Sequence, residues 1–447
     1  MTTPIRPAST PPRAPTAAGS AAATGPVRTQ DIPRTPWNFF VYLNGDNNLE
    51  SDAKDDLNEM EKMGSMPGRM NVFALVDGAT GTNSRDGHIP KKDGWSGGTR
   101  LMWIQKDPAN SKQVVSREVQ VDPKSDLGKL MAAGKGELNL GDPKVMNAAL
   151  KYVQANVPSE HLFVDMWDHG DSWREASSDE AGTDLEPFRG HLQQGLKDVK
   201  VDVLGFDECL MGAREIAQVA KGAGAQAMVG SEFLEPGSGW NYADLFTRFN
   251  KLFDDKNVTA QTLARATVDS YATGGKDNSH LAATDLTRFD SVEAKTAALS
   301  DALLRAGGLS NKGIKSAYQT ALRDDDIHEQ MDLGDFAKKL EASTTLPPEI
   351  RDAAKALSAE IAAAEYSKTG KGATGAARTT GLTTYAPLSR FDQDYVKTPS
   401  NPWVDTRWTD FIRGANGSPS GGSGTRSVHP HSKGGAGAGE GLNWFLQ

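Results

Sequence analysis

The stretch V-D-V-L-G-F-D-E-C-L-M-G at Val201–Gly212 decides how this chain is interpreted, because an apolar run there breaks into a glycine-punctuated turn that carries Cys209, the sole cysteine of 447 residues. A second apolar run ends in the same way upstream, in H-L-F-V-D-M-W-D-H-G at His161–Gly170, and its turn carries His169. Short, near-continuous apolar runs of this kind are typical of strands in a mostly parallel sheet that helices cover on both faces. The sequence therefore predicts an α/β fold.

Cys209 and His169 each stand at the exit of a predicted buried strand. Parallel strands present their carboxyl ends at one edge of the sheet, where α/β proteins bind ligands, so we expect the two side chains to converge. A lone thiol beside an imidazole indicates nucleophilic catalysis. Each residue taken singly has a simpler interpretation, because a free cysteine is often a small buried hydrophobe and a histidine near an apolar run is often a hydrogen-bonded core residue.

The chemistry of such a pair assigns roles to the neighbouring backbone. The cysteine attacks as a thiolate, and His169 takes its proton and then protonates the leaving amine. The tetrahedral intermediate needs oxyanion donors, for which we expect the N–H groups of Gly170 and Cys209, with a helix that begins directly after Cys209. The alternative for Gly170 is an ordinary tight turn.

Asp207 stands two residues before Cys209 and points to the same side of the strand. An acid beside the nucleophile opposes thiolate formation, because a like charge raises the pKa of the thiol. It is useful if Asp207 faces a neighbouring pocket and binds a substrate Arg or Lys side chain. The alternative is that Asp207 caps the N-terminus of the following helix, and the residues alone leave both interpretations open.

Composition excludes several classes of protein. The formal net charge of −9 argues against nucleic-acid binding, and a single cysteine rules out an intramolecular disulfide. No run approaches 18 apolar residues, so no membrane partner is expected. The N-terminal residues lack the apolar core of a signal peptide, which predicts a cytoplasmic protein or, alternatively, export without a cleavable signal.

Changes in composition predict four regions along the chain. Residues 1–35 form a Pro/Ala-rich disordered arm, residues 36–255 an α/β domain, residues 256–413 a helical subdomain whose chain returns to the sheet, and residues 414–447 a Gly/Ser-rich tail. Within the α/β domain, strands are predicted at Trp37–Leu43, Asn71–Val76, Arg100–Gln105, Gln113–Val121, His161–Trp167, Val201–Phe206 and Ala227–Gly230, and helices at Asn47–Met63, Asp142–Ala155 and Leu185–Val199.

Several further segments, taken in order with the two strand exits, resemble the clostripain family of cysteine peptidases, which are relatives of caspases. These segments are W-N-F-F-V-Y-L-N-G-D-N-N-L-E (37–50), N-L-G-D-P (139–143), W-D-H-G (167–170), F-D-E-C-L-M-G (206–212), S-E-F-L-E-P-G-S-G-W-N-Y (231–242), M-D-L-G-D-F (331–336) and G-L-T-T-Y-A-P (381–387). The resemblance covers roughly residues 36–413.

The resemblance implies a caspase-like fold, with a mostly parallel sheet between helices, and endopeptidase activity after basic residues. By position, His169 and Cys209 match the catalytic dyad, and Asp207 matches the acid that receives the Arg or Lys side chain. No cofactor is required for the chemistry, although some members depend on calcium. Two departures, H-G-D-S-W (169–173) and Glu208, add negative charge near the expected mouth of the site. They put the preference at neighbouring subsites in doubt.

Members of this family are often matured by a cut between the histidine and the cysteine, and Arg174 and Arg189 are the candidate self-cleavage positions in that segment. For calcium, the sequence offers the acidic cluster of Asp179, Glu180 and Asp184 and the run at 324–326, for which a solvated acidic loop is the alternative. The main competing functions are a non-catalytic scaffold or binding protein that keeps the peptidase fold, and a hydrolase or peptidase of other specificity that uses the same dyad.

Overall fold

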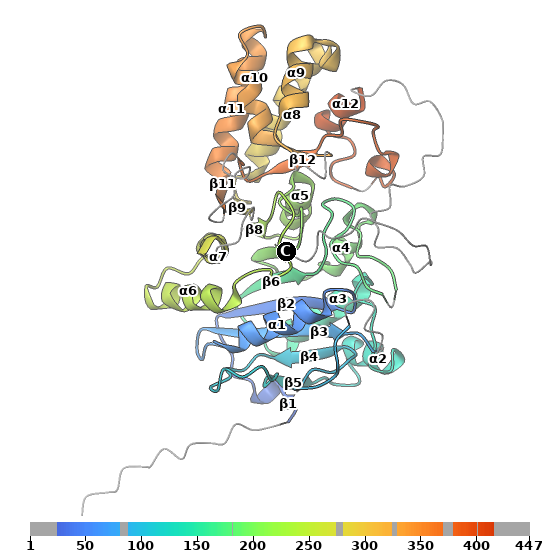
Figure 1. Ribbon diagram of the computed structural model, residues 1–447, viewed down its shortest axis with the longest axis vertical. Coiled ribbons are helices and arrows are strands. Elements are labelled where there is room, and N and C mark those ends of the chain that lie inside the picture. The colour runs from blue at the N-terminus through green and yellow to red at the C-terminus, as the bar shows by residue number, and fades with distance from the viewer. Residues whose placement is uncertain are drawn as a thin grey trace, which may run out of the picture.

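A ten-stranded sheet forms the centre of the protein in the computed structural model. The structure describes residues 25–80, 88–180, 182–273, 280–323, 329–369, 379–399 and 401–414. The strand order is β1-β5-β4-β3-β2-β6-β7-β8-β9-β11, and Figure 1 shows the sheet extending upward from β1 to β9 and β11, with the C-terminal helices above it. The strands are β1 (Val27–Arg28), β2 (Trp37–Gly45), β3 (Met70–Gly78), β4 (Arg100–Trp103), β5 (Arg117–Gln120), β6 (His161–Trp167), β7 (Val203–Asp207), β8 (Ala227–Gly230), β9 (His280–Asp285) and β11 (Glu365–Thr369).

The centre of the sheet is parallel. β2 pairs in parallel with β3 on one side and with β6 on the other, and β6, β7 and β8 continue in parallel. The flanking pairs β3/β4, β4/β5, β8/β9 and β9/β11 are antiparallel. The predicted fold class, an α/β sheet that is mostly parallel, is therefore confirmed.

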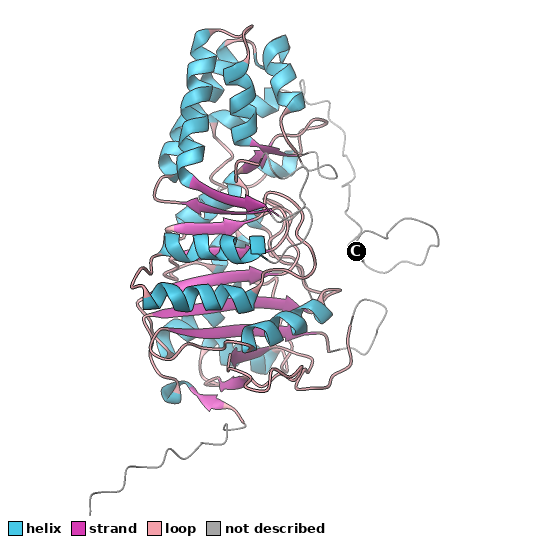
Figure 2. Cartoon of the chain, turned by 60° about the vertical axis from the view of Figure 1, so that its left-hand side comes forward, coloured by secondary structure: helices cyan, strands magenta, loops and turns pink. Residues whose placement is uncertain are grey.

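Helices cover both faces of this sheet, as Figure 2 shows. One face packs against α1 (Glu50–Glu61), α6 (Tyr242–Asp254) and α7 (Ala260–Thr273) around the side chains of Phe39, Val41 and Phe163. The opposite face packs against α2 (Asp126–Ala133), α3 (Pro143–Asn156), α4 (His191–Gly195) and α5 (Arg214–Gly222) around Phe40 and Val164. Successive residues of a strand thus supply both layers, which explains why the central strands are apolar without alternation.

The C-terminal part of the chain is largely helical. It contains α8 (Phe289–Arg305), α9 (Lys312–Thr320), α10 (Leu333–Ala342), α11 (Pro348–Ala364) and α12 (Arg407–Gly414), with a two-stranded sheet of β10 (Gln330–Asp332) and β12 (Thr383–Tyr385). Its core is continuous with the α5 side of the main sheet. The chain returns to the main sheet through β9 and β11, whereas β12 pairs with β10.

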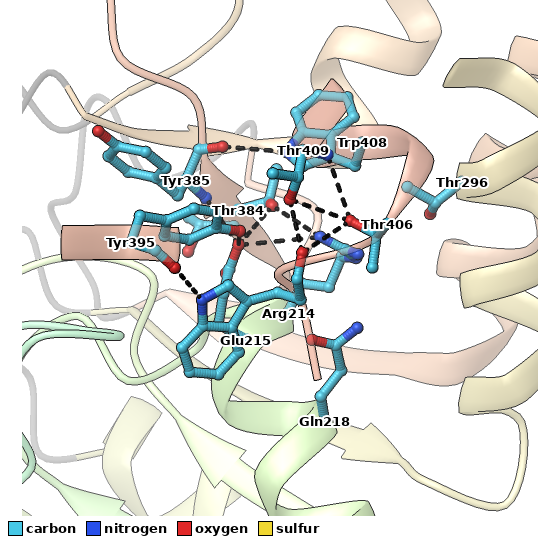
Figure 3. A network of polar contacts seen from close by, with 12 residues as sticks. Arg214, Glu215, Gln218, Thr296, Thr384, Tyr385, Tyr395, Thr406, Trp408 and Thr409 are labelled. Carbon is cyan, nitrogen blue, oxygen red and sulfur yellow. Dashed lines mark hydrogen bonds and ion pairs between the residues drawn. The ribbon is translucent and has the colours of Figure 1, made fainter. Parts of the chain in front are cut away.

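A buried polar network joins α5, which follows the Cys209 turn, to this helical part (Figure 3). The guanidinium of Arg214 makes two hydrogen bonds to the carboxylate of Glu293 on α8, at 2.6 and 3.1 Å. Glu215 accepts hydrogen bonds from the hydroxyls of Thr384 and Tyr395 at 3.0 and 2.7 Å. A buried network whose members are paired holds one arrangement, so these contacts fix α5 against the helices.

Some local predictions differ from the structure. The predicted helix Leu185–Val199 is reduced to a 3₁₀ turn at Pro187–Arg189 and the short α4, because Gly190 between them adopts a left-handed backbone with φ of 74°. The folded part begins before Trp37, since Val27 and Ile32 are buried. The rest of the predicted arm (1–24), the tail beyond residue 414 and the acidic run at 324–326 lie outside the described residues. Among the helices of the described ranges, none has the length and apolar character needed to cross a membrane.

Candidate active site

The turns that carry His169 and Cys209 leave adjacent strands at the same edge of the sheet. β6 and β7 pair in parallel up to Trp167 and Asp207, so the histidine and the cysteine each lie two residues past that last pair. The two turns are in direct contact at Gly170, where a Cβ atom would lie 2.5 Å from the carbonyl oxygen of Cys209. The structure therefore brings the two turns that carry the predicted residues into contact, and only glycine allows this close approach.

The thiol of Cys209 lies against the loop that follows β8. Its Sγ accepts a hydrogen bond from the backbone N–H of Glu235 at 3.2 Å. The next residue, Leu210, has a left-handed backbone with φ of 64°, and its N–H donates to the carbonyl oxygen of Phe233. This left-handed conformation cannot be part of a regular α-helix, and α5 begins only at Arg214. The predicted helix start at Cys209 is therefore wrong, and a strained turn rather than a helix N-terminus presents the cysteine.

The imidazole of His169 is oriented by Asn48, which the sequence analysis did not single out. Nε2 of His169 lies 2.8 Å from Oδ1 of Asn48. Because an amide oxygen only accepts, Nε2 carries the hydrogen and Nδ1 is left as the basic nitrogen. Asn48 lies between β2 and α1, at the carboxyl end of the strand that neighbours β6. The polar run N-G-D-N-N after an apolar strand was the signal available in the sequence.

Asp168 holds the loop that carries Asn48. Its carboxylate accepts hydrogen bonds from the side chains of Asn44, Asn47 and Ser177 at 2.9, 2.7 and 2.8 Å. It also accepts from the N–H of Ser178 at 2.7 Å. Burial nevertheless raises the pKa of Asp168 to about 8. One buried side chain thus links the β2–α1 loop to the residue directly before His169.

Asp207 points into a buried acidic cluster on the α1/α6 face, which consists of Asp56, Asp165, Asp207 and Glu235. The hydroxyl of Tyr242 bridges Asp165 and Asp207, at 2.8 and 2.9 Å from one carboxyl oxygen of each. The hydroxyl has one hydrogen, so at least one of these carboxyls must be protonated to complete the bridge. Burial raises the pKa of Asp207 to about 7 and raises the pKa values of the other three well above their usual range.

The same geometry decides between the two interpretations of Asp207. The residue before α5 is Ala213, so Asp207 does not cap that helix. The backbone of the loop after β8 closes over Asp207, since Trp240 N donates to its carboxylate at 2.9 Å and a Cβ atom at Gly239 would lie 2.7 Å from it. Asp207 therefore lies buried beneath the loop that follows β8, beside the cysteine turn.

Glu208 does not place charge at the mouth of the site, contrary to the sequence-based expectation. Its side chain is buried on the opposite side from Asp207, with its Cβ 2.9 Å from the position of a Cβ at Gly170. Burial, followed by repulsion from Asp168 and other acids, raises the pKa of Glu208 well above its usual range. Burial therefore disfavours the charged form of this carboxyl.

The two arginines between the dyad residues are both folded into the structure. Arg174 lies over the ring of Trp173 at 4.4 Å and pairs with Glu329 and Asp392 from the C-terminal part of the chain. Arg189 ends the 3₁₀ turn, pairs with Glu186 at 2.6 Å, and keeps 46% of its side chain exposed. Arg189 is therefore the more accessible of the two predicted self-cleavage positions.

A group of acidic residues suited to a metal ion lies at the carboxyl ends of β2 and β3. One carboxylate oxygen from each of Asp46, Asp77 and Glu137 lies within 4.8 Å of the others. Of the acids that the sequence offered for calcium, Glu180 belongs to a second group with Asp46 and His88, whereas Asp179 and Asp184 belong to neither group. Asp179 instead accepts a hydrogen bond from the N–H of Leu140 at 2.6 Å.

This fold is the caspase-like α/β architecture that the resemblance implies. The profile of the clostripain family matches residues 41–381, so the chain belongs to the clostripain family. Clostripain from Hathewaya histolytica is 28% identical over 330 residues, which are 65% of this chain and 59% of clostripain. The chain thus spans less than two thirds of the length of that relative.

Solved structures show the same fold. A secreted C11 cysteine protease from Bacteroides thetaiotaomicron, in complex with an irreversible peptide inhibitor, matches with a TM-score of 0.59 and 18% identity, over 84% of this chain and 99% of that one. An inactive zymogen C11 protease from Parabacteroides distasonis matches with a TM-score of 0.57 and 15% identity, over 85% and 99%. At these identities the likeness shows a common architecture.

Proposed function

We propose that this chain is a cysteine endopeptidase that cleaves peptide bonds after Arg or Lys through Cys209 and His169. The observation that carries the proposal is the contact of the two strand exits at Gly170 together with the buried acidic cluster that begins two residues before the cysteine. Membership in the clostripain family supports the peptidase class.

In the proposed reaction, the thiolate of Cys209 attacks the carbonyl carbon of the scissile bond. The oxyanion that forms accepts hydrogen bonds from the N–H groups of Gly170 and Cys209. The C–N bond breaks as Nδ1 of His169 delivers its proton to the leaving amine. Water, deprotonated by the same nitrogen, then hydrolyses the thioester and releases the thiol. Asn48 keeps Nε2 occupied, so Nδ1 is the nitrogen that exchanges protons.

The acidic cluster is suited to a basic side chain at the cleaved bond. Burial disfavours the charged form of these four carboxyl groups, and a cation that enters the cluster would stabilise that form. The Coulomb attraction between a guanidinium or ammonium and Asp207 is strong in this setting because water is excluded. An acidic substrate side chain would be repelled from the same pocket.

The remaining predictions follow from the same proposal. Substrates are proteins or peptides with Arg or Lys at the cleaved bond, and the chemistry requires no cofactor. Self-cleavage, if it takes place between the dyad residues, is expected after Arg189 rather than Arg174, since Arg174 is held by two acids and an indole ring. The cytoplasmic location stays a prediction, and the likeness to a protease described as secreted does not support it.

Fluorogenic peptides that differ only at the residue before the reporter test the proposal. We expect turnover of Arg and Lys peptides, little turnover of Asp or Leu peptides, and none with Cys209→Ala. Asp207→Asn should lower kcat/KM for the Arg peptide by about 30-fold or more, because a buried charge pair is worth roughly 2–5 kcal/mol. Inactivity of the wild-type protein on every peptide, with calcium added, would favour the non-catalytic scaffold.

The pH profile adds an independent check. The pKa of Asp207 lies near 7 because burial disfavours its charged form. Its negative charge is therefore lost as pH falls through about 7, and kcat/KM for the Arg peptide should fall with it. A peptide with an uncharged residue at that position should not show this dependence. Identical profiles for both peptides would contradict the assigned role of Asp207.

A further inference from the structure

We propose that Arg174 is a positioning residue for the turn that carries His169, because it ties that turn to the part of the C-terminal chain that also holds the Cys209 turn. The inference rests on the proposed function, since the placement of the two turns matters to catalysis only if they act together. Three observations carry it, which are a closed turn after the histidine, an arginine that is both ion-paired and stacked, and a strand that contacts both turns.

The chain directly after the dyad histidine forms a short closed turn. The N–H of Asp171 donates to the carbonyl oxygen of Glu175 at 2.9 Å, and the carbonyl oxygen of Asp171 accepts from the N–H of Arg174 at 3.0 Å. Between them, Ser172 has a left-handed backbone with φ of 53°, which is uncommon for a residue with a side chain. A shift of Arg174 therefore moves backbone that lies only two residues from His169.

The ring of Trp173 packs this turn against the C-terminal part of the chain. Trp173 is fully buried, and its ring makes edge contacts with the rings of Tyr385 and Tyr395 at centroid distances of 5.4 and 5.2 Å. Edge-to-face contact is a favoured geometry for aromatic pairs. The carbonyl oxygen of Trp173 also accepts a hydrogen bond from the N–H of Phe188 at 3.1 Å. The indole is thus fixed from several sides.

Arg174 adds charge pairing to the same contact. Its Nη2 atom pairs with the carboxylate of Glu329 and lies 3.3 Å from a carboxylate oxygen of Asp392. Its Cζ atom lies 4.4 Å from the ring centre of Trp173 and 5.9 Å from that of Tyr385. Only 25% of the side chain is exposed, so water screens these pairs less than it screens an ordinary surface pair. A planar guanidinium can stack on rings and pair with acids at once.

The Cys209 turn is attached to the same strand, β12. The N–H of Thr383 donates to the carbonyl oxygen of Gly212 at 2.9 Å. Near the start of α5, the carboxylate of Glu215 accepts from the N–H of Tyr385 at 3.2 Å (Figure 3). Tyr385 therefore contacts both sides of the site, with its backbone toward the cysteine turn and its ring toward the histidine turn.

This shared attachment gives the C-terminal part of the chain a positioning role without a reacting group. Loss of the ion pairs of Arg174 would loosen the histidine side and leave the cysteine side in place. Misplacement of a catalytic group by about 1 Å costs on the order of 100-fold in rate. Substrate affinity should change little, because Asp207 and its acidic neighbours do not contact Arg174.

Arg174→Met removes the ion pairs and keeps the aliphatic stem over Trp173. It should lower kcat for an Arg peptide about tenfold or more, with less than about a twofold change in KM. Arg174→Lys restores the positive charge and should recover part of the lost kcat. Glu329→Gln changes the contact mildly from its other side, and should lower kcat in the same direction. The double variant Arg174→Met/Glu329→Gln should be no slower than Arg174→Met, because both changes remove the same contact.

Arg288→Met is the matched control. Arg288 also pairs with an acid from a distant segment, Glu360 at 2.8 Å, and 44% of its side chain is exposed. Its loss removes an ion pair of the C-terminal part that touches neither turn, so kcat should not change. Thermal melting of every variant shows that it is folded at the temperature of the assay.

Hydrogen exchange gives a measurement that needs no peptidase activity. In the Cys209→Ala background, Arg174→Met should speed exchange at residues 169–176, where the N–H groups of residues 171, 174 and 176 are hydrogen-bonded, and Arg288→Met should not. Unchanged exchange there, an unchanged kcat in Arg174→Met, additive losses in the double variant, or an equal loss in Arg288→Met would overturn the proposal. An unmodified protein that turns over no peptide would instead refute the proposed function, and faster exchange in Arg174→Met would still support the attachment of the turn by Arg174.

Discussion

Replacing Gly170 by alanine tests whether contact between the two strand exits sets the geometry of the site. The new Cβ would lie 2.5 Å from the carbonyl oxygen of Cys209 and 2.9 Å from side-chain atoms of Glu208 and Met211. Ordinary contact for a Cβ begins at 3.4 Å, so the shortest contact is 0.9 Å too close (3.4 − 2.5). The atom in the way belongs to the backbone, and the histidine turn and the cysteine turn must therefore move apart by most of an ångström.

A displacement of about 1 Å in a catalytic constellation costs on the order of 100-fold in rate. Forcing a methyl group into a packed site costs roughly 1–3 kcal/mol of unfolding free energy. We therefore expect Gly170→Ala to lower kcat/KM for an Arg peptide by about two orders of magnitude. The melting temperature should fall as well, whereas the peptide preference should stay the same because the acidic cluster around Asp207 is untouched.

Gly222→Ala provides the matched control, because a Cβ at this helical glycine meets no atom within 4 Å. Alanine there should leave activity unchanged and should stabilise α5 by a few tenths to about 1 kcal/mol. Denaturant unfolding and initial-rate kinetics on the three proteins give both quantities. Wild-type activity and stability in Gly170→Ala would refute the claim that this glycine sets the distance between the two turns.

Two further predictions concern groups that position the site. Asn48→Ala should lower kcat roughly 10- to 100-fold with little change in KM, since the imidazole loses its acceptor. Asn48→Asp should retain an acceptor and move the acid limb of the pH profile to higher pH, because a carboxylate raises the pKa of His169. Equal pH profiles for the two variants would contradict this assignment. Arg214→Ala should lower the unfolding free energy by roughly 3 kcal/mol, because it leaves Glu293 and the buried Glu215 without their cation. A loss below about 1 kcal/mol in urea unfolding would show that the network does not hold α5.

The central strands could be predicted because their sequence pattern has one physical cause. β6 and β8 have the limits that their apolar runs predict, His161–Trp167 and Ala227–Gly230, since both faces of each strand are buried. β9 (H-L-A-A-T-D) and β11 (E-Y-S-K-T) are pieces of the same sheet that lack this pattern. β11 is the last strand of the sheet and β9 pairs with it and with β8, so tertiary pairing rather than local composition decides their structure.

The residues of the candidate site also fall into those that the sequence predicts and those that only the fold brings together. His169, Cys209 and Asp207 follow from strand exits, which are visible in the sequence as apolar runs that stop. Asp56 on α1, Asp165 within β6 and Glu235 in a loop join the acidic cluster only through folding. The sequence predicts a helix directly after Cys209, but Leu210 adopts a left-handed backbone there. A leucine does not signal this conformation in the sequence as a glycine would. Long-range proximity and unusual backbone angles are the two properties that local sequence does not encode.

The placement of the acids bears on how a chain with net charge −9 could use Cys209 as the proposed nucleophile. Glu208 is adjacent to Cys209, but burial and neighbouring acids disfavour the charged form of its carboxyl, which would otherwise oppose the thiolate. Burial also disfavours the charged form of Asp207 and its three acidic neighbours, because it raises their pKa values. A substrate cation that enters this cluster would stabilise the charged form, so binding of a basic peptide should weaken as pH falls through about 7. An affinity for an Arg peptide that is insensitive to pH between about 6 and 8 would show that this cluster does not receive the basic side chain.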